Sequence, residues 1–150
     1  MKPSEVRRRV LSDHEELRQQ LERLERRAQA AVKGAADASA ELRRQGEALL
    51  DRLAIHMSWE DRYLVPVVRV ADGWGDERAA RIAEDHRAQR ELLRYALRQL
   101  HDQSRPEPLV ASNLLDLVAL LRKDMDEEEQ AFLDEWLLRD DPVAIDLFIG

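Results

Sequence analysis

Three of the four histidines occupy positions that an apolar side chain would be expected to fill. His14, His56 and His86 lie in three separate runs in which apolar residues recur every three or four positions, the period of a buried helix face. One such histidine alone is most simply explained as a hydrogen-bonded core residue. His101, at the end of its run, is interpreted as an ordinary surface residue. Three histidines on predicted buried helix faces together indicate a common function, and imidazole is a common ligand of transition metals.

Three carboxylates occupy the same kind of position. An ionised carboxylate alone in a low dielectric is so costly that it normally takes up a proton or finds a cation. Glu60 follows His56 by four residues. Glu128 follows Asp124 by the same interval, so each pair would lie one turn apart on a single helix face. Either pair could chelate a cation, and either pair alone could equally be a surface arrangement.

The composition narrows the chemistry further. The chain has no cysteine, so any metal must be held by histidine and carboxylate side chains. The formal net charge of -7 would repel the phosphate backbone of a nucleic acid, and acidic neighbours offset the basic run at 7–9. No signal core follows the first residues, and no run approaches the roughly 18 apolar residues that span a membrane. We therefore expect a cytoplasmic protein that binds neither nucleic acid nor membranes.

The elements that must position these residues are predicted to be helices. Hydrophobic residues make up 44% and charged residues 37% of 150 residues, with only five glycines and five prolines, which favours one all-α domain over 1–150. Period and turn residues predict helices at about 4–33, 37–71, 76–103 and 108–138, followed by a short apolar tail at 141–150. Long helices joined by short turns predict an up-down-up-down four-helix bundle.

Two local features complete this prediction. Pro66 falls inside the second helix and should bend it or loosen the preceding turn. The fourth helix carries its polar residues within its apolar stripe, which reads Leu114, Leu117, Leu121, Asp124, Glu128 and then Ala131 or Phe132.

Counting residues from the turns places the polar positions at one height in such a bundle. His14 and His56 lie about 21 residues on either side of a turn centred near residue 35. His86 lies about 20 residues before the third turn, and Asp124 and Glu128 lie about 18 and 22 after it. Across the second turn the mismatch is about four residues, or roughly 6 Å, which loop geometry could absorb. All six side chains should therefore share one core layer, where bundles build two-metal sites.

The ordered set of segments resembles the hemerythrin-like, or HHE cation-binding, family, whose pattern is His, His-x-x-x-Glu, His, His-x-x-x-Glu. The matching segments are Asp-His-Glu-Glu-Leu around His14, His56-Met-Ser-Trp-Glu60, Asp85-His86-Arg87 and Asp124-Met-Asp-Glu-Glu128. Tyr63-Leu-Val-Pro66 is similar to an aromatic-x-x-Pro segment of the family, and the resemblance extends over essentially the whole chain. It implies the metal ligands His14, His56, Glu60, His86 and Glu128, with the two glutamates bridging the metals.

Two positions depart from the family pattern. Asp124 stands where a histidine is expected, and Arg90 stands where true hemerythrins carry a second histidine four residues after the third. With Asp124 included, the site would offer three imidazoles and three carboxylates, a set that suits iron or manganese better than copper. Asp124 is therefore a sixth candidate ligand, and because aspartate is shorter than histidine, it either coordinates its metal directly or reaches it through water.

The resemblance implies a cofactor of two iron ions, bridged by an oxo or hydroxo group and by carboxylates, with manganese as an alternative. It implies a small diatomic or peroxide ligand, in binding or sensing O2, peroxide or NO, or a role in handling iron. Anionic ligands should stabilise ferric iron, so we expect a sensor, scavenger or iron-handling protein ahead of an O2 carrier.

Several alternatives stay open at this point. One is a di-iron peroxidase or oxidase built on the same centre, so enzymatic activity is undecided. Another is a metal-free structural bundle in which Asp124 marks a lost site. The chain could also form a homodimer or bind an unidentified protein partner. Trp59 and Tyr63 flank Glu60 and could restrict access to the metals, although core packing is the favoured interpretation for both.

Overall fold

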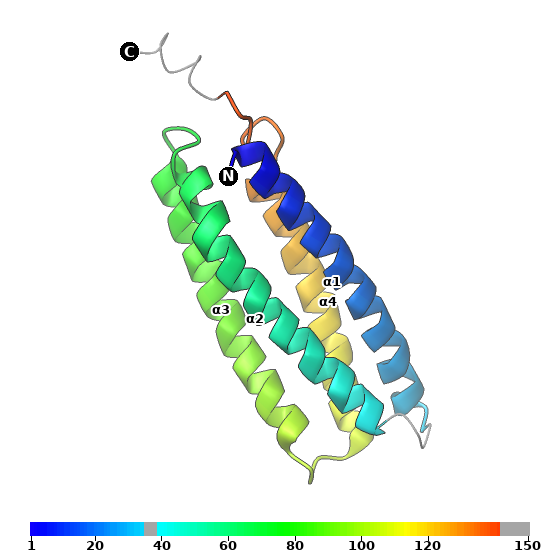
Figure 1. The fold of residues 1–150 in the computed structure, drawn as a ribbon. Helices are drawn as coiled ribbons and strands as arrows, with labels where there is room; N and C mark the ends of the chain where they lie inside the picture. Colours follow the sequence, from blue (N-terminus) through cyan, green and yellow to red (C-terminus); the bar gives the residue numbers. More distant parts are fainter. Residues whose placement is uncertain (35–38, 142–150) are drawn as a thin grey trace.

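Four long helices account for most of the structure. The computed structural model describes residues 1–34 and 39–141. Within these ranges it contains no strand, and its helices are α1 (Pro3–Val32), α2 (Ser39–Arg69), α3 (Gly75–His101) and α4 (Glu107–Phe132). Neighbouring helices run antiparallel (Figure 1), with α1 packed between α2 and α4, and α2 packed against α3. The predicted all-α, up-down-up-down bundle is confirmed.

Two glycines are required where helices end. Gly34 follows α1 with a φ of +86°, a left-handed conformation that glycine adopts without steric cost, and its N–H bonds to the carbonyl of Ala31. Gly75 opens α3, and a Cβ there would lie 1.8 Å from the carbonyl oxygen of Arg69. A backbone atom cannot move aside as a flexible side chain can, so the α2–α3 turn tolerates only glycine at this position.

The ends of α2 and α4 differ in how they follow the sequence pattern. Pro66 lies inside α2, which nevertheless continues to Arg69. In contrast, α4 ends at Phe132, six residues before the predicted end at 138. Residues 135–138 form a turn that buries Leu137 and Leu138 against the end of the bundle. The apolar spacing of Leu137 and Leu138 therefore reflects burial in this turn and not a continuation of α4. Of the predicted tail 141–150, all but the first residue lies outside the described ranges.

The apolar core is divided into two parts along the bundle. The lower cluster, toward the α1–α2 and α3–α4 turns at the bottom of Figure 1, contains Leu17, Leu21, Leu24, Ala28, Ala31, Leu42, Leu49, Leu50, Leu53, Met57, Leu93, Leu100, Val110, Ala111, Leu114, Leu117, Val118, Leu121 and Met125. The upper cluster, toward the α2–α3 turn, contains Val6, Val10, Leu64, Val68, Ala71, Ile82, Phe132, Leu133, Leu137 and Leu138.

A band of buried and partly buried polar residues, here called the polar layer, separates these clusters. It consists of His14, His56, Glu60, His86 and Glu128, which fall between the lower and upper cluster residues of all four helices. The buried face of each helix therefore keeps its period through the polar layer, while its residues change from apolar to polar. In the described residues, no helix is both long enough and apolar enough to cross a membrane.

Candidate metal centre

Donor atoms from three helices meet at the centre of the polar layer. One nitrogen or oxygen from each of His14, His56, Glu60 and Glu128 lies within 4.8 Å of all the others. The Nε2 atom of His14 lies 3.2 Å from Oε1 of Glu128 and 3.2 Å from Nε2 of His56. Nε2 of His56 in turn contacts Oε1 of Glu60. Two imidazoles and two carboxylates thus face one small volume.

His86 adds α3, the remaining helix, to the same site. Its Nε2 atom lies 3.8 Å from Oε2 of Glu60 and 3.9 Å from Oε2 of Glu128. His86, His14 and Glu60 are each only 1% exposed. Five of the six residues predicted from the sequence therefore converge, one or two from each helix.

The pKa values of the two carboxylates of the layer shift in opposite directions because the groups are close together. Burial raises the pKa of Glu60 well above its usual value, and the negative charge of Glu128 raises it further. Burial also disfavours the charged form of Glu128, but the neighbouring imidazoles of His14 and His86 outweigh it and lower the pKa of Glu128. Two carboxylates that share a buried space resist ionising together, and a cation between them would remove this conflict.

The histidines respond to the same charges. Burial lowers the pKa of His56 to about 4, helped by the neighbouring charge of His14. Burial lowers the pKa of His14 and His86 too, but the nearby carboxylates, Glu128 and one outer carboxylate for each, outweigh it and raise the pKa of each. Metal ligands must be neutral imidazoles and ionised carboxylates, so the binding of a cation would release protons from these residues.

Unpaired polar atoms show that the layer is not satisfied by its own hydrogen bonds. Oε2 of Glu60, Nε2 of His86 and Oε1 of Glu128 are buried without a hydrogen-bond partner. They are three of only five such side-chain atoms in the described part of the chain. Buried polar groups are nearly always paired in proteins, so a cluster of three indicates a site that can take a cation. Imidazole and carboxylate donors suit iron, manganese or zinc, and the residues present fit such an ion.

Comparison with known proteins agrees with this geometry. The family model described as the hemerythrin HHE cation binding domain matches residues 6–136. The chain belongs to the hemerythrin HHE cation-binding family. The match covers all four helices and every predicted ligand, and the predicted family resemblance is confirmed. Comparison with the curated proteins and with the solved structures gave no match.

Each imidazole of this HHE domain is held from behind by a second carboxylate. Nδ1 of His86 lies 2.6 Å from Asp61, Nδ1 of His14 lies 3.1 Å from Glu129, and Nδ1 of His56 lies 3.4 Å from Asp13. An imidazole that donates its Nδ1–H to a carboxylate directs Nε2 toward the metal and becomes a better ligand.

Sequence reasoning missed these outer carboxylates, although a signal for them exists. Asp13 precedes His14, Asp61 follows Glu60, and Glu129 follows Glu128. Because each of these residues is next to a predicted ligand in the sequence, it lies beside the inward-facing side of its helix. From there it can reach a histidine on the neighbouring helix.

An arginine backs each of the outer carboxylates. Arg9 Nε lies 3.2 Å from Asp13, and Arg18 contacts Glu129. Arg90, which replaces the second histidine of true hemerythrins, lies 2.5 Å from Asp61. At this position the chain therefore carries a cation that pairs with the carboxylate behind His86.

Asp124 is the predicted ligand that the structure does not bring into the cluster. Its Oδ2 accepts a hydrogen bond of 3.2 Å from Nε2 of Gln89, and the side chain is only partly buried. The buried stripe of α4 passes through Met125, so Asp124 lies at its edge, facing α3. Direct coordination by Asp124 stays a prediction.

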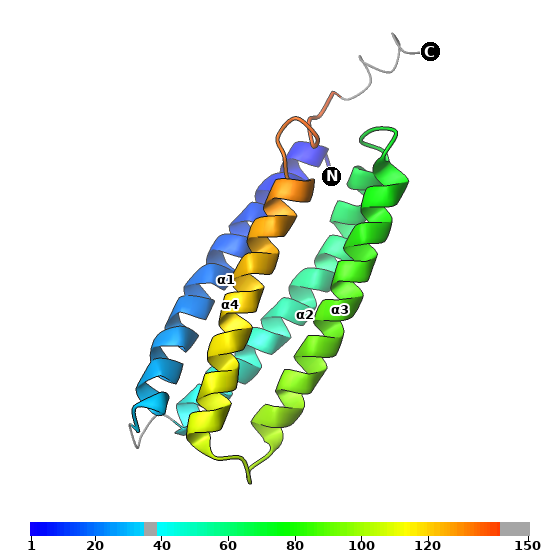
Figure 2. The same cartoon turned by 180° about the vertical axis from the view of Figure 1, so that it is seen from behind.

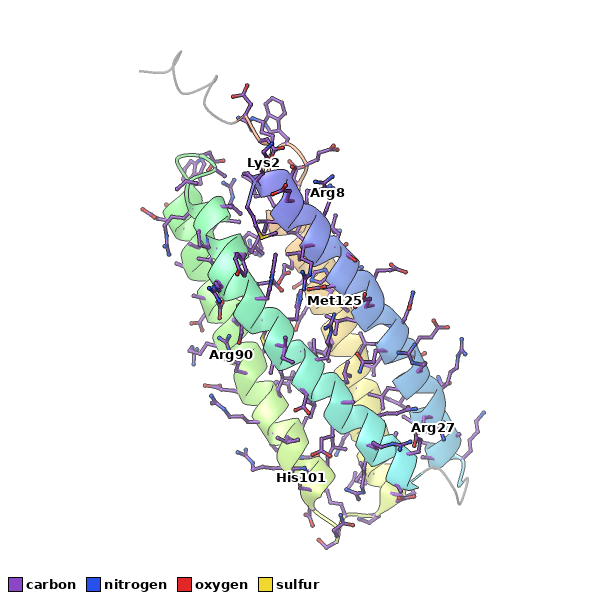
Figure 3. The ribbon with its side chains drawn as sticks, in the orientation of Figure 1. Lys2, Arg8, Arg27, Arg90, His101 and Met125 are labelled. Atoms are coloured by element: carbon purple, nitrogen blue, oxygen red, sulfur yellow. The ribbon has the colours of Figure 1, made fainter. Side chains whose placement is uncertain are left out.

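The remaining candidates have ordinary roles in the packing. His101, at the lower end of α3 (Figure 3), is exposed and lies 2.9 Å from Glu47. The rings of Trp59 and Tyr63 lie 4.8 Å apart and pack against the upper cluster. This contact agrees with the interpretation that both aromatic residues belong to the core.

Proposed function

We propose that this domain binds two iron ions in the polar layer. The imidazole Nε2 atoms of His14, His56 and His86 and the carboxylates of Glu60 and Glu128 would hold them. The observation that carries the proposal is the convergence of three buried, unpaired donor atoms from α2, α3 and α4. The metal-free alternative is disfavoured because it would leave these atoms without partners in the core. Manganese fits the same donors and is the alternative metal.

A ferrous pair would supply two electrons and an open coordination position for O2, peroxide or NO. The protein's own contribution is to hold the donors and to set the charge around them. Glu60, Glu128 and the carboxylates behind the three imidazoles surround the centre with negative charge, which favours ferric over ferrous iron. This supports a sensor, a scavenger or an iron-handling protein rather than a carrier that must release O2.

Asp124 is proposed to act on the centre through water. It lies one turn before Glu128 on α4, and its carboxylate is directed to Gln89. A carboxylate one turn from a ligand and tied to another side chain is suited to hold a coordinated water in place.

The test is the iron content of protein loaded anaerobically with ferrous iron and then oxidised. Two irons per chain, with absorption bands of a bridged ferric pair, are expected. The variant His86→Ala should lose iron, while the matched control His101→Ala, an exposed histidine on the same helix, should keep it. A wild-type protein that retains no iron would refute the proposal.

The role of the loaded centre needs a second experiment. Reduced protein is mixed with O2, NO or peroxide, and the spectrum is followed until the ligand is removed again. Release of bound O2 on lowering its pressure would contradict the preference for sensing or scavenging over carriage. Repeated turnover of peroxide would identify the enzyme alternative, which uses the same ligands.

A further inference from the structure

The α3–α4 side of the bundle contains a cavity that reaches the polar layer. α3 and α4, which face the viewer in Figure 2, pack less closely on each other than on their other neighbours. A cavity of about 400 Å³ lies between them. Glu128 is one of its lining residues, and it also contacts His14 and His86 in the centre. The cavity and the candidate metal site therefore share a carboxylate.

Negative charge dominates this cavity. Asp85, Asp124, Glu127 and Glu128 line it, together with one cation, Arg81, whose guanidinium lies 5.4 Å from the centre of the Phe132 ring. Beside the cavity, Nζ of the exposed Lys123 lies 3.7 Å from Oε1 of Glu127. Burial raises the pKa of Asp124 against the hydrogen bond from Gln89, and the charges of Glu127 and Asp85 raise it further. A cleft with low-dielectric walls and one sign of charge concentrates ions of the opposite sign.

The other three sides of the polar layer carry arginines. Arg9 and Arg52 approach Asp13 between α1 and α2, Arg90 pairs with Asp61 between α2 and α3, and Arg18 pairs with Glu129 between α1 and α4. A cation approaching through any of these interfaces meets a fixed positive charge. On the α3–α4 side, within the described residues, Gln89 and not an arginine contacts Asp124, and the ion pair of Glu127 is with the exposed Lys123.

Glu128 links the cavity to unpaired atoms of the polar layer. Oε1 of Glu128 is buried without a hydrogen-bond partner. Oε2 of Glu128 lies 3.9 Å from Nε2 of His86, which lies 3.8 Å from Oε2 of Glu60, and these two atoms are unpaired and belong to side chains that are 1% exposed. An ion that enters the cavity thus finds successive oxygen donors that lead to the centre.

We propose that this cavity is the entry site of the metal, where Asp85, Asp124 and Glu127 first bind a hydrated divalent cation and pass it to Glu128. The inference rests on the proposed function, because it names how that same centre is filled. Carboxylates hold hydrated divalent cations through water, and a partly hydrated ion can exchange its waters for protein oxygens one at a time.

The experiment measures the rate of anaerobic ferrous iron uptake by stopped flow, with a ferrous chelator reporting free iron. The test protein is the double variant Asp85→Asn, Glu127→Gln, which leaves Asp124 in place. The control is Asp51→Asn, Glu77→Gln, which removes the same charge from exposed positions elsewhere. We expect uptake roughly 10-fold slower in the test variant and near wild type in the control, with final iron content unchanged and a smaller difference at high salt.

Two results would overturn the entry site and leave the proposed function standing. One is wild-type uptake kinetics in the test variant. The other is equally slow uptake in the control variant, which would show that the overall charge of the protein, and not the cavity, sets the rate. If the wild-type protein takes up no iron at all, the proposed function fails and the entry site fails with it. Circular dichroism checks that each variant is folded.

Discussion

The lower cluster and the polar layer are neighbouring regions of the same four helices, yet different forces hold them together. In the lower cluster, leucines such as Leu17, Leu21 and Leu49 are fully buried, and their transfer from water stabilises the fold. One turn away, His14 and Glu60 are equally buried, and their burial costs free energy unless a partner satisfies them. The helix period is the same in both regions. A few polar residues in place of apolar ones on a continuous buried face therefore convert a packing surface into a candidate metal site.

The largest effect on folding is expected in the lower cluster. Leu21→Ala should destabilise the protein by about 2–5 kcal/mol, because it removes buried methyl groups and leaves a cavity. Urea unfolding with and without iron measures this loss, which should be the same in both conditions. A loss that depends on iron would mean that the two regions are not independent.

In the polar layer, the corresponding change should act on metal binding and leave folding intact. Glu60→Gln keeps the shape of the side chain but removes a charge and a donor oxygen. The wild-type protein should gain about 2.7 kcal/mol with an ion at 100 times its Kd, or roughly 5–10 °C in Tm, and the variant should gain nothing.

The same variant with chelator present supplies the control. There it should be at least as stable as the wild type, since glutamine ends the repulsion between Glu60 and Glu128. Retention of iron by Glu60→Gln, or strong destabilisation in chelator, would show that the layer is structural.

The helices and most of the layer could be predicted from the sequence because both depend on local spacing. The face of α1 that the helical period predicts to point inward is buried from Val6 to Ala28. The heights of His14, His56 and His86 followed from counting residues between turns, since a straight helix has a fixed rise. A mismatch of about four residues at the second turn did not prevent His86 from reaching Glu60 and Glu128.

Features that depend on helix rotation could not be obtained in this way. Steps of three and four residues both continue a stripe, so spacing alone did not decide between Asp124 and Met125 after Leu121. The structure decides it, because Met125 completes the lower cluster and leaves Asp124 at the α3–α4 cavity. The outer carboxylates were missed because each supports a ligand on a different helix, a contact that no sequence interval encodes.

A residue that contacts a ligand without being one should affect metal binding less than the ligand itself does. Asp61→Asn removes the carboxylate behind His86 while keeping its shape, and iron affinity should fall roughly 10–100-fold. Competition with a chelator measures the affinity. The control Asp51→Asn, an exposed aspartate on the same helix, should leave it unchanged. Equal affinities for the wild type and Asp61→Asn would mean that the ring of His86 is fixed by packing alone.

The smallest effect is expected from Arg90, which lies near the middle of α3 (Figure 3) and touches the centre only through Asp61. Both side chains of this pair are more than a third exposed, so solvent screens their attraction. Arg90→Gln should weaken iron binding by only about two- to five-fold, with the difference disappearing at high salt. Arg94→Gln, one turn along α3, serves as the matched control because it removes an exposed charge outside the Asp61 pair. An effect of Arg90→Gln as large as that of Asp61→Asn would instead show that the arginine, and not the packing of α2 on α3, orients the carboxylate behind His86.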